Sequence, residues 1–314
     1  MSQAANAAGA GTAPTIGFIG IGSMGWPMAS RLRQAGLKVV ALDASVERLK
    51  EFAAKTGAVA AANGAELAAQ SDVIITILPT SAVVEQVLTG PQGVLAGLKP
   101  GAVIVEMSSG VPTETQRLAG LVREAGGHLI DAPVSGGVPR ATTGELAIMV
   151  GGEPELVERV KPVLSHMGKA ITHTGPVGTA HAMKALNNLV SAGGFLIGIE
   201  AMLIGQRFGL DPEVMVDVFN SSTGMNNSTQ KKFKQFVLSR RFDSGFGLDL
   251  MIKDLRIALG LADSGNVPAP FASLCRDLWA SAGKLLGPGQ DHTAMARLSE
   301  TLAASELVVQ AEKK

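Results

Sequence analysis

Residues 15–34 read TIGFIGIGSMGWPMASRLRQ, a short apolar run followed by a glycine-rich loop and an amphipathic stretch. Gly20, Gly22 and Gly25 give the loop the spacing GxGxxG. In a strand-loop-helix unit the first glycine permits a tight turn, the second lets the backbone approach a pyrophosphate, and the third lets the helix pack on the strand. We therefore expect a dinucleotide to bind at this loop, which consists of Gly20, Ile21, Gly22, Ser23, Met24 and Gly25.

An acidic residue stands where this motif needs one. Asp43 follows the next apolar run, 18 positions after Gly25. A carboxylate there accepts hydrogen bonds from a ribose 2′-hydroxyl and repels a 2′-phosphate, so Asp43 favours NAD and leaves NADP possible. Two observations keep alternatives open: Asp43 can instead shape the turn before Ser45, a candidate helix N-cap, and Arg48 can in principle meet a phosphate.

Apolar runs alternate with amphipathic stretches through the first half of the chain, as in βαβ units of a parallel sheet. The predicted strands are 15–19, 38–42, 73–78, 103–106 and 128–131, with further candidates at 146–150 and 170–173. Helices are predicted over 46–55, 81–88 and 113–125. The pattern predicts an α/β fold with a Rossmann-type doubly wound sheet over residues 15–175.

Strand signals disappear after Gly175, so the second half is predicted to be all-helical. One long helix is expected over 180–208, and another starts at Asp211 and Pro212, an N-cap followed by a first-turn proline. Later helices are predicted over 248–264, 270–286 and 295–311. We expect a helical substrate and oligomerisation domain over 176–314 and a flexible Ala/Gly-rich tail over 1–14.

Composition excludes several classes of function. Lys+Arg and Asp+Glu number 27 each among 314 residues, and this zero formal charge favours a small-molecule partner over nucleic acid. The single cysteine, Cys275, excludes an intrachain disulfide and fits a reducing compartment, and no metal site is predicted. We expect no membrane anchor or signal peptide, hence a soluble, cytoplasmic protein. The absence of tyrosine rules out reductase mechanisms with a tyrosine proton donor.

Two further stretches suggest a substrate site. Residues 131–137, DAPVSGG, place Ser135, Gly136 and Gly137 just after a predicted strand, where a hydroxyl and exposed N–H groups can hold a carboxylate. Lys184 and Asn188 are four residues apart, so an ammonium and a carboxamide share one helix face and can address one substrate oxygen.

The chain resembles the β-hydroxyacid dehydrogenase family, which includes 3-hydroxyisobutyrate dehydrogenase and tartronate semialdehyde reductase. Four motifs in the family's order carry the resemblance: GFIGIGSMGWPMA at 17–29, DAPVSGG at 131–137, GPVGTAHAMKALNN at 175–188 and KDL at 253–255. The resemblance implies a 6-phosphogluconate dehydrogenase-like cofactor domain. It further implies that Ser109 and Lys253 lie near the nicotinamide cofactor, and Leu78 and Pro79 are expected to line it.

One departure from the family pattern concerns the catalytic motif. Ala180 stands where the family usually has glycine, and His181 where it commonly has glutamine. The added methyl group puts the substrate geometry in doubt more than the catalysis. His181 is interpreted as a helix-surface or interdomain residue.

The resemblance implies hydride transfer between a nicotinamide and a small 3-hydroxy acid of the 3-hydroxyisobutyrate type. Lys184 is the predicted proton donor and acceptor, and Asn188 the residue that orients the substrate. Alternatives are a tartronate semialdehyde, threonate or L-serine enzyme, an NADP-dependent aldehyde-acid reductase, a non-catalytic NAD-binding module and an imine reductase. A homodimer or homotetramer is expected. Whether the Lys- and Phe-rich segment 231–236 borders the pocket or an interface is left open.

Overall fold

The computed structural model describes residues 13–309. These residues form two compact units, one up to His181 and one from Ala182. The two units divide within the first turn of the long helix that begins at Thr179. The domain boundary near Gly175 stays a prediction. Most of the tail predicted over 1–14 lies outside the described residues.

The first unit is built on a nine-stranded sheet of order β3-β2-β1-β4-β5-β6-β8-β7, with β9 paired to β8. Strands β1 to β6 are parallel neighbours, and β8 runs antiparallel to β6 and β7. The chain order reverses at β1, which lies between β2 and β4, and such a switch point is where open sheets bind ligands. The strands are β1 (Ile16–Ile19), β2 (Val39–Leu42), β3 (Val59–Ala60), β4 (Val73–Thr76), β5 (Val103–Glu106), β6 (His128–Asp131), β7 (Val134–Ser135), β8 (Leu146–Gly151) and β9 (Gly168–Gly175).

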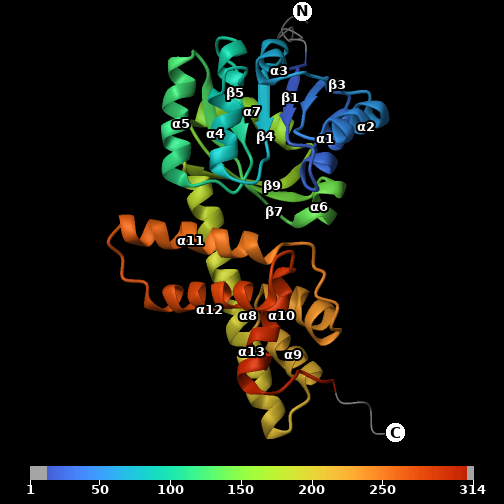
Figure 1. Ribbon diagram of the computed structural model, residues 1–314, viewed down its shortest axis with the longest axis vertical. Helices are drawn as coiled ribbons and strands as arrows, with labels where there is room; N and C mark the ends of the chain where they lie inside the picture. Colours follow the sequence, from blue (N-terminus) through green and yellow to red (C-terminus); the bar gives the residue numbers. More distant parts are fainter. Residues whose placement is uncertain (1–12, 310–314) are drawn as a thin grey trace, which may run out of the picture. The chain divides into compact units, whose positions relative to one another are not determined.

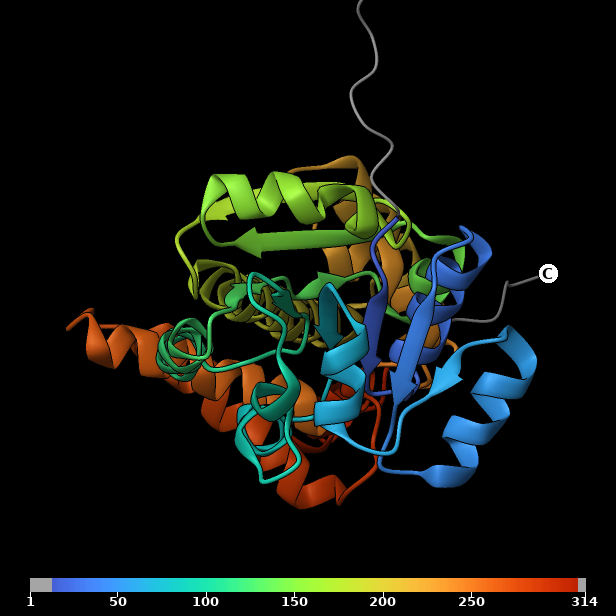
Figure 2. The ribbon, with the colours of Figure 1, turned by 90° about the horizontal axis from the view of Figure 1, so that it is seen from above.

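Helices cover both faces of this sheet because its strands are apolar on both sides (Figure 1, Figure 2). On β4, Val73 and Ile75 belong to the core under α1 (Gly25–Gln34), α2 (Val46–Thr56), α6 (Gly137–Thr143) and α7 (Pro154–Leu164). Ile74 belongs to the core under α3 (Gly64–Gln70), α4 (Ser81–Thr89), η1 (Val94–Gly97) and α5 (Pro112–Glu124). The predicted doubly wound Rossmann fold is confirmed.

The second unit is helical, as predicted, and its core contains Phe195, Phe233 and Trp279. Asp211 is the N-cap of α9, where its carboxylate accepts the N–H groups of Glu213 and Val214. The elements are α8 (Thr179–Phe208), α9 (Pro212–Ser221), α10 (Asn227–Lys231), the π-helix η2 (Phe233–Leu238), α11 (Leu248–Ser264), α12 (Pro270–Leu286), the 3-10 helix η3 (His292–Met295) and α13 (Ala296–Ala303).

The last predicted helix, 295–311, is wrong in its length, because α13 ends at Ala303. Ala304 has a left-handed φ of 45°, and the guanidinium of Arg207 donates to the carbonyls of Ala303 and Ala304. The following chain is held by Glu300, whose carboxylate accepts the N–H of Leu307. Tertiary hydrogen bonds thus replace helical ones over a segment of helix-forming composition.

Helix α8 is long and apolar enough, by length and composition alone, to cross a membrane. This is weak evidence, because 56% of its most apolar window is buried inside the structure, as in the core helix of a soluble protein.

Candidate active site

The glycine loop has the geometry of a dinucleotide cradle. Gly20 has a φ of +100°, and a Cβ there would lie 2.3 Å from the carbonyl oxygen of Ile77. A Cβ on Gly25 would lie 1.8 Å from the carbonyl oxygen of Gly20, whereas a Cβ on Gly22 would meet nothing within 4 Å. The fold itself therefore demands the first and third glycines, and the second leaves open space beside the backbone. Since α1 has no side-chain cap and no acidic residue in its first turn, this space fits a pyrophosphate.

Asp43 has two structural contacts at the end of β2. Its Oδ2 accepts the N–H of Ile21 at 2.6 Å, and its Oδ1 accepts the N–H of Ser45 at 2.8 Å. Ser45 caps α2 as predicted, and the Arg48 guanidinium lies 3.8 Å from Asp43. The carboxylate therefore both holds the glycine loop and shapes the turn before α2. Ile21 is buried, Ser23 is exposed and Met24 is half-buried.

The ends of β4 and β5 are joined by a serine that sequence reasoning missed. Ser108 accepts the N–H of Leu78 on its Oγ at 2.8 Å, and its own N–H donates to Glu106 Oε1 at 2.8 Å. Ser108 is buried, whereas its neighbour Ser109, which the family resemblance assigned to the cofactor, is half-buried. Leu78 is half-buried and Pro79 exposed, so Ser108 fixes the backbone of a partly accessible segment.

The predicted carboxylate-binding loop lies at the edge of the sheet. Ser135 ends β7, and Gly136 and Gly137 have φ values of +132° and +66°. A Cβ on Gly136 would lie 2.6 Å from Cδ of Arg140. Ser135 is half-buried and both glycines are exposed, so their polar groups are accessible to a ligand.

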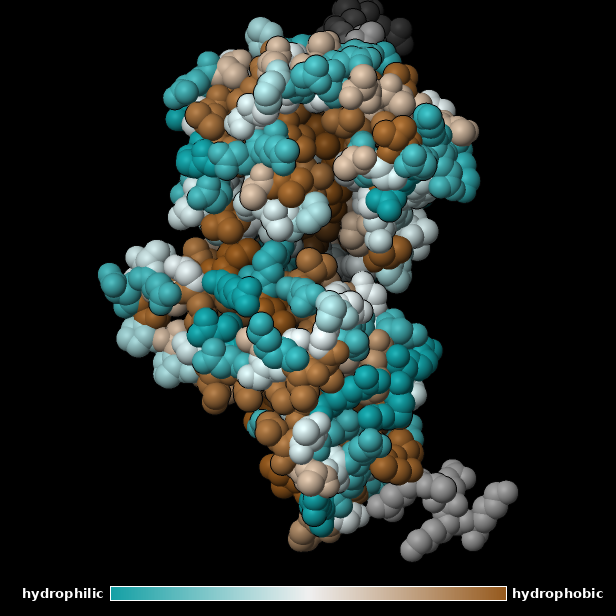
Figure 3. Space-filling model, viewed as in Figure 1, coloured by the Kyte–Doolittle hydropathy of each residue, from teal (hydrophilic) through white to brown (hydrophobic). Residues whose placement is uncertain are grey.

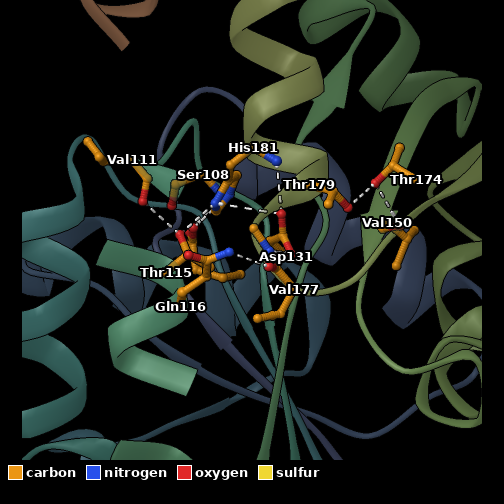
Figure 4. A network of polar contacts seen from close by, with 12 residues as sticks. Ser108, Val111, Thr115, Gln116, Asp131, Val150, Thr174, Val177, Thr179 and His181 are labelled. Carbon is orange, nitrogen blue, oxygen red and sulfur yellow. Dashed lines mark hydrogen bonds and ion pairs between the residues drawn. The ribbon is translucent and has the colours of Figure 1, made fainter. Parts of the chain in front are cut away.

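His181 lies at the start of α8 and is buried, with an exposed fraction of 1% (Figure 4). Its Nε2 lies 2.9 Å from Oε2 of Glu106, and its Nδ1 lies 2.8 Å from the Thr115 hydroxyl. Its backbone N–H donates to Asp131 at 2.8 Å, and the other oxygen of Asp131 accepts the N–H of Gly178 at 2.7 Å. Of the two interpretations of His181, the helix-surface one is wrong, because the side chain is buried, and the interdomain one stays a prediction. The physical reason is that Glu106 and Asp131, partners in the sheet register, are two buried carboxylates that need a cation.

The pKa values in this cluster follow from burial opposed by charge. Burial alone would lower the pKa of His181, but the charge and hydrogen bond of Glu106 raise it above its ordinary value. Burial would raise the pKa of Glu106, yet His181 and Ser108 hold it below its ordinary value. Burial raises the pKa of Asp131. Ala180, the other departure from the family motif, is fully buried beside this cluster.

The remaining predicted residues lie in the second unit. Lys184 and Asn188 are both 7% exposed. The Asn188 amide donates to Asp254 Oδ2 at 2.6 Å, and the Lys253 ammonium lies 3.4 Å from Asp254 Oδ1. Asp254 is 1% exposed, and its carboxylate orients Asn188, a role that the sequence did not predict. No local pattern marks Asp254, because its partner Asn188 lies 66 positions away in sequence.

The electrostatics of Lys184 favour proton exchange. Burial lowers the pKa of Lys184, the Asp254 carboxylate opposes this shift, and the Lys253 charge adds to it. A lysine with a lowered pKa can exchange a proton nearer neutral pH than a solvated one. Within residues 13–309, no group of three or more His, Cys, Asp or Glu is placed to hold a metal ion.

The fold and the cofactor loop define the class of protein as an NAD(P)-binding oxidoreductase. Residues 15–175 match the NAD-binding domain of 6-phosphogluconate dehydrogenase, and residues 178–299 match the family described as NAD-binding of NADP-dependent 3-hydroxyisobutyrate dehydrogenase. The chain belongs to the β-hydroxyacid dehydrogenase family, as its motifs predicted.

Individual relatives cover nearly the whole chain. The 2-(hydroxymethyl)glutarate dehydrogenase of Eubacterium barkeri is 40% identical over 91% of this chain and 95% of its own. The 2-hydroxy-3-oxopropionate reductase of Escherichia coli is 35% identical over 93% of this chain and 99% of its own. A solved structure of Mycobacterium tuberculosis 3-hydroxyisobutyrate dehydrogenase with L-serine has a TM-score of 0.84 and 31% identity, and covers 93% of this chain and 99% of that one. The chain is thus an oxidoreductase of the 3-hydroxy acid dehydrogenase type.

Proposed function

We propose that this enzyme transfers a hydride between NAD and a small 3-hydroxy acid, with Lys184 as the proton donor and acceptor. The observation that carries the proposal is a buried lysine of lowered pKa one helical turn from Asn188 on α8. When bound, the nicotinamide ring accepts the hydride in oxidation and donates it in reduction.

The proton chemistry belongs to Lys184. In oxidation its neutral amine takes the proton of the substrate hydroxyl, and in reduction its ammonium donates a proton to the carbonyl oxygen. Asn188 orients that oxygen, and Asp254 holds the Asn188 amide by accepting its N–H. The ammonium also stabilises negative charge that develops on the oxygen.

The other predicted residues take binding roles. Ser135, Gly136 and Gly137 hold the substrate carboxylate, supported by their accessibility at the edge of the sheet. Cofactor binding is assigned to Gly20, Ile21, Gly22, Ser23, Met24, Gly25, Asp43, Leu78, Pro79, Ser109 and Lys253. The preference for NAD over NADP is supported by Asp43, whose carboxylate repels a 2′-phosphate. A higher kcat/KM with NADP than with NAD would overturn this preference.

The substrate is sought among 3-hydroxy acids. The names of the relatives include monocarboxylic acids and a substituted glutarate, a dicarboxylic acid. A panel of 3-hydroxyisobutyrate, L-serine, D-glycerate, threonate and 2-(hydroxymethyl)glutarate, with NADH formation as the readout, tests the class. A lack of turnover with all of them would reject it.

The replacement Lys184→Met tests the proton role. We expect kcat to fall by about 10²- to 10⁴-fold, the usual contribution of general acid-base catalysis, while NAD binding, measured by thermal shift, is retained. Lys284→Met, at an exposed lysine of α12, is the matched control and should leave both unchanged. Turnover of Lys184→Met within a few-fold of wild type would refute the role of Lys184.

We further propose a homodimer or homotetramer in the cytoplasm. Apolar residues of α8 lie exposed at helical spacing, among them Val190 at 76%, Ile197 at 55% and Ile204 at 72%. Apolar patches are also visible between hydrophilic ones on the surface of the helical unit (Figure 3). Exposed apolar area of this kind supports self-association. Light scattering of Ile197→Glu should show a smaller particle than wild type. The single cysteine, Cys275, supports a reducing compartment.

A further inference from the structure

A second lysine of the helical unit, Lys232, has an unusual environment. It follows α10, is half-buried, and its ammonium contacts Nε2 of His292. Among the described residues, no carboxylate lies within ion-pair distance of it. Asp291 is the carboxylate whose charge acts on Lys232. Its oxygens already accept hydrogen bonds from the N–H groups of Gly245 and Phe246 and from the Thr293 hydroxyl. Lys232 is therefore a partly desolvated cation without a carboxylate partner.

Packing places Lys232 on the side of α8 that carries the catalytic pair. The ring of His292 packs against Phe195 of α8 at 6.2 Å between centroids. Phe195 follows Lys184 by 11 residues and Asn188 by 7, spacings that keep all three on one helix face.

A second line of contacts gives the same placement. The bridge between Gly247 and Asp291 holds the start of α11 beside His292, and seven residues later Asp254 of α11 meets Asn188. Asn188 and Phe195 are seven residues apart on α8, and Gly247 and Asp254 are seven residues apart at α11, so each pair is separated by about 10 Å along its helix. Two independent contacts thus place the Lys232 region about 10 Å from Asn188 along α8, on the helix face that carries Lys184 and Asn188.

The charges make this region an anion site. Burial lowers the pKa of Lys232 to about 8, with Asp291 opposing the shift and the nearby charge of Lys184 adding to it. Lys232 is therefore mainly an ammonium at neutral pH, and it lies close enough to Lys184 to be affected by the charge of Lys184. Lys184 and Lys253 both interact with the carboxylate of Asp254. A partly desolvated ammonium without a carboxylate partner, such as that of Lys232, is stabilised by an anionic ligand.

We propose that Lys232 binds a second carboxylate of the substrate, so that the enzyme acts preferentially on dicarboxylic 3-hydroxy acids. This inference rests on the 3-hydroxy acid dehydrogenase function proposed above. The second carboxylate accepts a hydrogen bond from the Lys232 ammonium, and His292 holds that ammonium in place through the contact with its Nε2.

The test compares 3-hydroxyisobutyrate with 2-(hydroxymethyl)glutarate, which bear the same hydroxymethyl and carboxylate groups and differ by the second carboxylate arm. Wild type should prefer the dicarboxylic acid. Lys232→Met should lose about tenfold to a hundredfold in kcat/KM for it, mainly through KM, while the monocarboxylic acid stays within about threefold. Lys232→Arg should keep most of the preference. Lys231→Met removes a neighbouring exposed charge and should change neither substrate.

The outcomes separate this inference from the proposed function. Wild type that oxidises 3-hydroxyisobutyrate equally well or better would overturn the role of Lys232 and leave the dehydrogenase function standing. An equal loss for both substrates in Lys232→Met, in a variant with wild-type melting temperature, would show a merely structural lysine and overturn the inference. Turnover of another acid of the panel but of neither of these two would likewise overturn the role of Lys232 alone. Turnover of none of the five panel acids would reject the proposed function itself.

Discussion

His181 and Lys184 lie three residues apart on α8 and are both buried, yet their pKa values shift in opposite directions. His181 belongs to the first unit, where Glu106 and Asp131 lie within 4.0 Å of its ring. Lys184 belongs to the second unit, where Asp254 is the carboxylate that opposes its desolvation and is shared with Asn188 and Lys253. Burial lowers the pKa of a cationic side chain unless nearby carboxylates compensate for the lost solvation.

The opposite pKa shifts of His181 and Lys184 suit these two residues to different roles on one helix. A histidine whose pKa is raised by the nearby carboxylates of Glu106 and Asp131 is suited to anchoring the first turn of α8, where Asp131 accepts the N–H groups of Gly178 and His181. A lysine with a lowered pKa is suited to giving and taking a proton. The experiments below test whether the dedicated carboxylates cause the contrast.

Removing the imidazole has the largest expected effect. His181→Ala leaves Glu106 buried without its cation, and breaking a buried pair in this way costs about 3–5 kcal/mol of unfolding free energy. Urea unfolding measures the loss. Replacing both partners, as in Glu106→Gln with His181→Gln, should recover a large part of it, because the unpaired charge of Glu106 is then also removed. His166→Ala, at a half-buried histidine after α7, is the control. A loss below 1 kcal/mol for His181→Ala would contradict the anchoring role.

The same pair predicts how stability changes with pH, which is a smaller effect than deletion of the ring. The pKa of His181 is raised above 6.5, so its contribution is complete below about pH 6.5 and is lost as pH rises through the folded pKa. The pKa of Glu106 is lowered below 4.5, so its contribution is complete above that pH and is lost as pH falls through the folded pKa.

The difference in unfolding free energy between wild type and His181→Gln, from urea unfolding at each pH, measures this contribution. It should be greatest between about pH 4.5 and 6.5 and decline on the alkaline side, at no more than about 1.4 kcal/mol per pH unit. A difference that stays constant from pH 5 to 10 would show that the imidazole carries no charge in the folded protein.

Much of the architecture could be predicted from sequence because its signals are local. Apolar runs and the glycine spacing identified β1, β4 and the cofactor loop, and the spacing of Lys184 and Asn188 put them on one helix face. Strand β3 (Val59–Ala60) is only two residues long, which is too short to give a recognisable strand pattern in the sequence. The environment of His181 depends on the Glu106 carboxylate, 75 positions away in sequence, and that of Asp254 on the Asn188 amide, 66 positions away. No local pattern can indicate either contact.

The Asp254 carboxylate should control the proton affinity of Lys184. Asp254→Asn removes the charge that opposes desolvation, so the pKa of Lys184 falls and the acidic limb of the oxidation profile moves to lower pH. On that limb we expect the normalised kcat/KM to rise by about threefold to tenfold. Asp249→Asn, an exposed carboxylate in the first turn of α11, is the matched control. A profile that does not move would mean that burial alone sets the pKa of Lys184.

Lys253 supplies the smallest and opposite effect. Its charge lowers the pKa of Lys184, and it ranks below both burial and Asp254 among the causes of the shift. Lys253→Met should therefore move the acidic limb to higher pH by less than Asp254→Asn moves it down. Because Lys253 is also assigned to the cofactor, the profile is measured at saturating NAD, where a weaker cofactor affinity does not contribute. Movement in the same direction as Asp254→Asn would show that both variants act by disturbing Asn188, and that charge does not explain the contrast between Lys184 and His181.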